Sequence, residues 1–216
     1  MSVLRAFVLW CWALGFGPLA HAESASEYLQ RFLETSSSVK AQFEQRVYLP
    51  SKNAQNGRIK QSSGSVEWSR PGKFRFDYQK PYVQTLVGNG RTVWFYDPDL
   101  AQVQVRQQQD LMRQSPMAWL IQTLPTAAQL QTWNVRFAPV SEAGLTRLQL
   151  EVPASQQTPA QVFVLDFGTQ GLQRIETRDT LGQRFEVLLS HWQSGALFSE
   201  RRFEFVIPPA TEVVRL

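Results

Sequence analysis

Short stretches in which apolar and polar residues alternate run through most of this chain. Residues 39–44 alternate Val, Ala and Phe with Lys, Gln and Glu, and residues 74–78 alternate aromatic with charged side chains. Because successive side chains of a strand point to opposite faces, this pattern predicts strands with one buried face. Similar runs are expected at residues 64–68, 84–87, 101–105, 135–137, 145–152, 161–167, 172–179, 184–192 and 203–207.

Turn residues separate these runs, and they set the connectivity that we expect. Asn89-Gly90 is a strong two-residue hairpin signal, and Asp97-Pro98-Asp99 marks another turn. Residues 92–96 between them are almost wholly apolar, so both faces of that strand should be covered. Many short strands joined by hairpins predict one antiparallel sheet that curls toward a barrel.

Two segments follow helical spacing instead. Ser24 and Glu27 fit a capping box, and the apolar residues after them predict a helix near residues 26–35. Ser115 and Pro116 fit a helix start, and the apolar residues that follow predict a second helix near 115–124. Thr126 to Leu130 is expected to add a short helical piece. These helices could lie over the opening of the curled sheet as a lid.

The first 22 residues have the organisation of a secretory signal peptide. Arg5 precedes an apolar run at residues 6–14, and Ala20-His21-Ala22 is a small-residue cleavage site. An uncleaved membrane anchor is the competing interpretation. The only cysteine, Cys11, lies inside the apolar run, so the mature chain should have no disulfide, thiolate or lipid anchor. We therefore expect a single domain at residues 23–216, located in a bacterial periplasm.

The mature sequence lacks the usual equipment of catalysis. His191 would be its only histidine, and no G-x-S-x-G, zinc-ligand or phosphate-loop motif is present. Asp97 and Asp99 flank a turn proline and are better explained as turn residues than as a catalytic acid pair. The formal charge of +4 comes from scattered basic residues without a basic block. These features predict a protein that is not an enzyme, needs no metal or cofactor, and binds no nucleic acid. We also expect the protein to be a monomer.

Large apolar side chains are what the sequence has in excess. They could fill a closed barrel as an ordinary core, or they could line a cavity that a lid covers. Aromatic and methionine side chains suit a surface that closes on itself when empty and repacks on a ligand. The residues expected to line such a cavity are Trp68, Phe74, Phe76, Tyr78, Trp94, Tyr96, Met117, Leu120 and Ile121.

Arg70 stands in a turn, directly before Pro71-Gly72. A guanidinium presents five donors in a planar fork, and the C-terminal ends of helices offer backbone carbonyls without partners. Arg70 could therefore hold a lid helix closed through bonds that break when a ligand enters. The alternative is a solvated turn arginine.

The stretch at residues 67–76, EWSRPGKFRF, and the later VWFYDP at 93–98 resemble the outer-membrane lipoprotein carrier family, LolA. Further matching positions are Phe43-x-Gln45, Ser115-Pro116-Met117 and the closing Phe203-x-Phe205-x-x-Pro208-Pro209. The resemblance implies a mainly β fold with an α-helical lid, which is an incomplete, open antiparallel β-barrel enclosing a hydrophobic cavity. It implies that Arg70 latches the lid, that Phe74 handles cargo near the cavity mouth, and that Phe76 takes the place of a cavity tryptophan.

The same resemblance implies a function. Members of this family take acylated lipoproteins from an inner-membrane ABC transporter and deliver them to an outer-membrane receptor. Two alternatives of similar fold remain, namely a periplasmic lipid-sensing or regulatory half-barrel domain and the outer-membrane receptor itself. The receptor would need a lipid-modified cysteine after the cleavage site, and Cys11 does not occupy that position.

Overall fold

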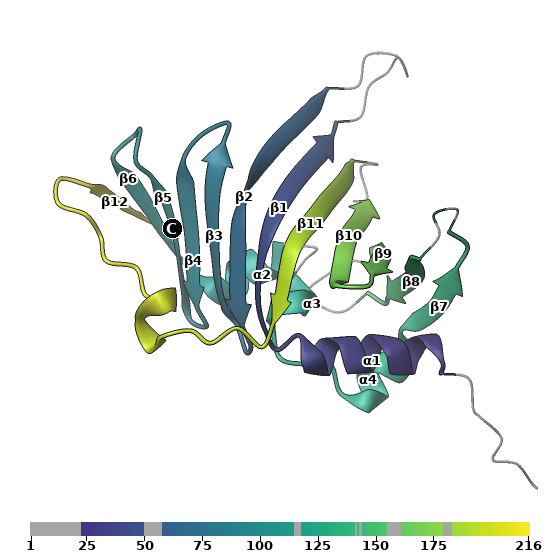
Figure 1. Ribbon diagram of the computed structural model, residues 1–216. Helices are drawn as coiled ribbons and strands as arrows, with labels where there is room; N and C mark the ends of the chain where they lie inside the picture. Colours follow the sequence, from purple (N-terminus) through teal and green to yellow (C-terminus); the bar gives the residue numbers. More distant parts are fainter. Residues whose placement is uncertain are drawn as a thin grey trace, which may run out of the picture.

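One curled sheet of twelve strands forms the body of the protein (Figure 1). The computed structural model describes residues 23–49, 58–114, 118–140, 142, 144–154, 161–178 and 183–216. The strand order is β12-β6-β5-β4-β3-β2-β1-β11-β10-β9-β8-β7. The strands are β1 (Ser38–Tyr48), β2 (Ile59–Ser69), β3 (Lys73–Lys80), β4 (Gln84–Asn89), β5 (Thr92–Asp97), β6 (Gln102–Gln107), β7 (Asn134–Ala138), β8 (Thr146–Val152), β9 (Gln161–Gly168), β10 (Gly171–Arg178), β11 (Arg184–Ser194) and β12 (Glu212–Arg215).

The sheet consists of two antiparallel meanders that meet at β1. This strand pairs with β2 on one side and with β11 on the other, which joins residues far apart in the sequence. β12 adds a parallel edge strand on β6. The edge strands β7 and β12 do not pair with each other in the described part of the chain, so the sheet stays open. The prediction of an incomplete antiparallel barrel is confirmed.

Helices occupy the hollow side and one end of the sheet. They are α1 (Ala25–Thr35), α2 (Gln108–Gln114), α3 (Ala118–Ile121) and α4 (Ala127–Thr132). In Figure 1, α2 and α3 lie behind the middle strands, while α1 lies below β7 to β10 with α4 next to it. None of the described helices is long and apolar enough to cross a membrane.

The expected features of α1 are present. Ser24 and Glu27 form both hydrogen bonds of a capping box, which satisfies backbone donors that a helix start leaves free. Leu29 and Leu33 on one face are almost fully buried, and each such burial contributes about 1.5–3 kcal/mol. Phe32 packs edge to face on Phe167 of β9, with ring centroids 4.9 Å apart. These contacts fix α1 on the end of the sheet formed by β7 to β10.

Alternation along the strands places apolar residues on the concave face and charges on the convex face. Val39, Ala41 and Phe43 of β1 are buried, as the sequence predicts. On the convex face Arg147 contacts Asp166 at 2.6 Å, and Arg174 contacts both Asp166 at 3.2 Å and Glu186 at 2.7 Å. Paired charges therefore connect β8, β9, β10 and β11 on their outer surface.

The prediction of a strand at residues 203–207 is wrong. The chain forms a 3-10 helix at Glu200–Phe203 and then an irregular segment that crosses the convex face. The alternating Phe203 and Phe205 rest on that face instead of joining the sheet. β4 and β5 beneath them already have neighbours on both sides, so no backbone partners remain there. Figure 1 shows this yellow segment in front of the sheet, opposite α2 and α3.

The second lid helix differs from its prediction. The described helix in this region is the short α3, whereas Ser115, Pro116 and Met117 lie outside the described residues. A helix not expected from the sequence, α2, directly follows β6. The short helical piece expected at 126–130 is present as α4, which begins with a capping box between Thr126 and Gln129.

Candidate functional site

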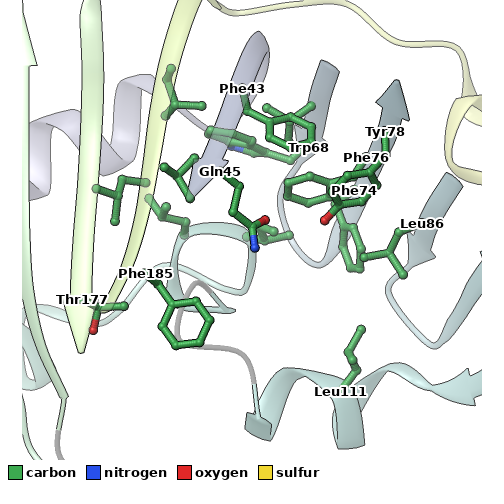
Figure 2. Close-up of a pocket in the computed structure, with 16 residues that line it drawn as sticks. Phe43, Gln45, Trp68, Phe74, Phe76, Tyr78, Leu86, Leu111, Thr177 and Phe185 are labelled. Atoms are coloured by element: carbon green, nitrogen blue, oxygen red, sulfur yellow. The ribbon is translucent and has the colours of Figure 1, made fainter. Parts of the chain in front are cut away.

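An apolar cavity of about 240 Å³ lies between the concave face of the sheet and the helices (Figure 2). Strands on both sides of β1 contribute to its wall, and α2 and α3 cover it. The lining consists almost entirely of hydrocarbon and aromatic groups and includes no charged side chain. The lining residues are Phe43, Gln45, Val66, Trp68, Phe74, Phe76, Tyr78, Leu86, Leu111, Leu120, Ile121, Ile175, Thr177, Phe185, Val187 and Leu189.

Most of the residues expected to form a cavity do line this one. They are Trp68, Phe74, Phe76 and Tyr78 from the sheet, with Leu120 and Ile121 from α3. Met117 was expected there too, but it lies outside the described residues.

Trp94 and Tyr96 do not line the cavity, which corrects the prediction for both. Their strand neighbours place them on the convex face, where Trp94 stacks on Phe205 at 6.4 Å and Tyr96 contacts the same ring at 5.5 Å. The expectation that both faces of residues 92–96 are covered is correct, because the C-terminal segment supplies the outer cover. Val93 is buried on the concave side.

The aromatic wall requires glycine at position 64. In the strand register Gly64 lies directly between Phe43 of β1 and Tyr78 of β3. A Cβ atom at Gly64 would come within 2.0 Å of the backbone oxygen of Asp77, so only glycine fits. Phe43 and Tyr78 meet across it edge to face, with centroids 5.1 Å apart. This part of the wall is therefore a continuous surface of rings.

Arg70 joins the turn after β2 to α1 and to the cover helix α3. Its Nε donates to the backbone oxygen of Leu120 in α3 at 2.7 Å, and its Nη1 donates to the backbone oxygen of Leu33 in α1. Beside it, the backbone N–H of Gly72 donates to the oxygen of Ile121 at 2.8 Å. The turn after β2 thus holds the backbone of both helices through a small number of hydrogen bonds.

The guanidinium of Arg70 is partly buried, which is unfavourable for a charged group. Burial lowers its pKa to about 10, which shows that the surroundings disfavour the charge. Its Nη2 is buried without a hydrogen-bond partner among the described residues. A buried donor left unpaired costs free energy, so these hydrogen bonds hold the cover with less net stabilisation than fully satisfied ones would.

Gln108, at the start of α2, was missed by the sequence analysis. Its side chain is only 4% exposed and connects two turns of the sheet. Nε2 donates to the oxygen of Gly72 at 2.6 Å, and Oε1 accepts from the N–H of Gly90 at 2.9 Å. Gln108 therefore fixes the same turn from which Arg70 and Gly72 reach the helices. It stands in a run of three glutamines, and nothing in the sequence distinguishes it from its neighbours.

Aromatic side chains of α1 cover the concave face at β7 and β9. Tyr28 and Phe32 of α1 pack on Phe167 at 5.2 and 4.9 Å, and Tyr28 also contacts Phe137. Within the described ranges no three His, Cys, Asp or Glu side chains are grouped so that they could hold a metal ion.

An open sheet with an apolar cavity, covered by helices that a few hydrogen bonds hold in place, defines a protein that binds an apolar ligand. The chain belongs to the LolA family, because the family model described as outer membrane lipoprotein carrier protein LolA matches residues 34–206.

Individual relatives agree with this family. The outer-membrane lipoprotein carrier protein of Methylobacillus flagellatus is 32% identical over 188 residues, which is 87% of either chain. That of Xanthomonas campestris pv. campestris is 35% identical over 191 residues, or 88% of either chain. A solved structure of a conserved uncharacterised protein from Thermus thermophilus matches with a TM-score of 0.52 at 15% identity. It covers 89% of this chain and 99% of its own, and it shows the fold alone.

Proposed function

We propose that the protein carries lipoproteins through the periplasm by sheltering their acyl chains in the cavity under α2 and α3. As a member of the LolA family it is an outer-membrane lipoprotein carrier and not an enzyme. The observation that supports the proposed site is the uncharged, aromatic-walled cavity whose cover is held by Arg70.

The cost of moving a lipid through water explains why such a cavity is needed. Burying one methylene is worth roughly 0.8 kcal/mol, so an acyl chain of about 16 carbons is disfavoured in water by about 12 kcal/mol. A lipid-modified protein therefore stays in its membrane unless a carrier provides another apolar environment. The carrier must also release the chain, which requires that its own empty state is stable.

The small size of the cavity supports a cover that moves during loading. Its volume of about 240 Å³ is below the roughly 300–1,000 Å³ of pockets that bury a drug-sized ligand, and lipoproteins carry more than one chain. Loading then requires that the hydrogen bonds of Arg70 and Gly72 to the helices break. Closure after release restores these bonds and buries the aromatic wall again, which weakens the net affinity for cargo and favours unloading.

We further propose that cargo is received from the inner-membrane lipoprotein-releasing ABC transporter and passed to the outer-membrane receptor. Residues 1–22 would serve as a cleaved signal peptide for export to the periplasm, the compartment of the LolA family. Energy for loading would come from the transporter, and unloading would proceed downhill to a more apolar site.

Competition binding tests this function. The mature protein, residues 23–216, is incubated with a fluorescent fatty-acid probe, and a triacylated lipopeptide is added. We expect the lipopeptide to displace the probe, and the same peptide without acyl chains should leave the probe bound. If the triacylated peptide does not displace the probe, the carrier function is wrong for this cavity.

A further inference from the structure

Four side chains in the cavity lining carry a polar group: Gln45, Trp68, Tyr78 and Thr177. Two of these groups are already used within the protein. The Nε1 of Trp68 donates to the backbone oxygen of Ser36 at 3.0 Å, and the hydroxyl of Thr177 donates to that of Val162 at 2.9 Å. The amide of Gln45 and the hydroxyl of Tyr78 remain, and neither has a hydrogen bond to another residue within the described parts of the chain.

Both groups belong to the wall where the ring surface is continuous. Gln45 lies on β1 two residues beyond Phe43 and on the same face. Its partner on β11 is Val187. Tyr78 contacts the ring of Phe43 from β3. Figure 2 shows the Gln45 side chain extending into the open space between the aromatic wall and Phe185. Two donors are thus presented to an otherwise apolar cavity.

An unpaired amide or hydroxyl on an apolar surface is unfavourable unless a ligand or water satisfies it. A hydrocarbon tail has no acceptor, but every acyl chain ends in a carbonyl. A carboxylate or phosphate would require a cationic partner, and the lining contains none. The chemistry that fits is therefore the neutral ester carbonyl of a diacylglyceryl group.

We infer that Gln45 and Tyr78 bind the ester carbonyls at the head of the cargo's acyl chains and so set how far the chains enter the cavity. This inference rests on the proposed function and specifies which part of the ligand the site recognises. Neutral donors suit a carrier, because each bond is strong enough to fix position and weak enough to break on release.

Matched ligands and variants test the inference. Displacement of the fluorescent probe is measured with a diacylglyceryl lipopeptide that has ester linkages and with its ether-linked analogue, which keeps the chains but lacks the carbonyls. The variants are Tyr78→Phe, which removes only a hydroxyl, and Gln45→Leu. The control is Gln42→Leu, an exposed glutamine on the opposite face of the same strand. Thermal unfolding checks that every variant is folded.

We expect each cavity variant to bind the ester lipopeptide about 3- to 10-fold more weakly and the ether analogue unchanged. A phospholipid with the same ester-linked chains shows whether the site recognises the ester in any lipid or only in a lipopeptide. Weaker binding by the variants supports the inference in both cases. Equal changes for ester and ether ligands, or no change for either, would overturn it while leaving the carrier function intact. Failure of the unmodified protein to bind either lipopeptide would overturn the carrier function as well.

Discussion

The Nε of Arg70 donates a hydrogen bond of 2.7 Å to the backbone oxygen of Leu120, so one side chain of the turn after β2 holds the backbone of a cover helix. A second nitrogen of the same guanidinium reaches Leu33 in α1. The two helices are far apart in the sequence, and Arg70 connects them through carbonyls that a helix end leaves without partners. Opening the cavity at α3 therefore also disturbs the contact with α1.

Replacing Arg70 by leucine should favour the open cover. Hydrogen bonds to a charged group contribute about 1.5–3 kcal/mol each, so we expect loading to continue while delivery to an acceptor slows at least about tenfold. Arg70→Lys should resemble Arg70→Leu, because an ammonium cannot form the fork that reaches both helices. Transfer of a labelled lipoprotein between membranes measures the effect. Arg91→Leu, at an exposed position in the turn between β4 and β5, is the control, and normal delivery by Arg70→Leu would remove the latch role.

Gln108 should contribute to both stability and closure. Gln108→Leu leaves the oxygen of Gly72 and the N–H of Gly90 without their partner, and each unpaired buried group costs about 1–3 kcal/mol. We expect a decrease of about 2–4 kcal/mol in the free energy of unfolding in urea, together with faster proteolysis of the cover. Gln109→Leu, the exposed neighbour, should have little effect. If both variants are equally stable, the turns do not depend on Gln108.

Phe205 should stabilise the fold without affecting the cavity. Phe205→Ala removes the ring that covers Trp94 and Tyr96 on the convex face, and we expect a loss of about 2 kcal/mol in stability. Tryptophan fluorescence should shift to the red as Trp94 becomes exposed, while the affinity for the lipid probe stays unchanged. Val206→Ala, at a position that is 85% exposed, is the control. Weaker lipid binding by Phe205→Ala would mean that the convex face takes part in the site.

Asp166 should make the free energy of unfolding depend on pH. Burial raises the pKa of its carboxyl, but hydrogen bonds and charges from Arg147 and Arg174 outweigh this and hold that pKa below its usual value. A depressed pKa gives stability that is present above the unfolded pKa of about 3.9 and is lost as pH falls through the folded value. Unfolding in urea between about pH 6 and pH 2 should show this loss, which should be smaller in Asp166→Asn, where Glu186 of the same cluster still has a depressed pKa.

Asp166→Asn should also be less stable near neutral pH, by about 3 kcal/mol, because Arg147 loses its paired carboxylate and Arg174 loses one of its three. Glu142→Gln, at an exposed turn, should retain the acid-dependent loss of the unmodified protein. An unchanged acid profile in Asp166→Asn would assign the loss to other carboxylates.

Local patterns in the sequence correctly predicted features that depend on neighbouring residues, such as the start of a helix and the two faces of a strand. The capping box at Ser24 and Glu27 begins α1, and alternation along residues 39–44 gives the buried and exposed faces of β1. Arg70 donates to backbone carbonyls of α1 and of the cover helix α3, as its fork of donors and the family resemblance suggested. Each of these features depends on residues close together in the sequence or on the chemistry of one side chain.

The residues that line the cavity could not be predicted from local sequence patterns. Ile175, Val187 and Leu189 reach it only because β11 pairs with β1 across more than half of the chain. Trp94 and Tyr96 are aromatic like the cavity residues, but the register of β5 on β4 places them on the convex face, where Phe205 covers them. Gln108 looks like its neighbours until two distant turns meet at its amide.

The sequence by itself determined that this chain forms a curled antiparallel sheet with apolar helices and an arginine suited to hold them. Only the tertiary structure decided which face is hollow, which rings meet across Gly64, and where an amide and a hydroxyl remain unpaired. The physical reason is that periodicity fixes the direction of a side chain relative to its own backbone. What that side chain then meets depends on strand pairing and curvature, which arise from contacts between distant parts of the chain.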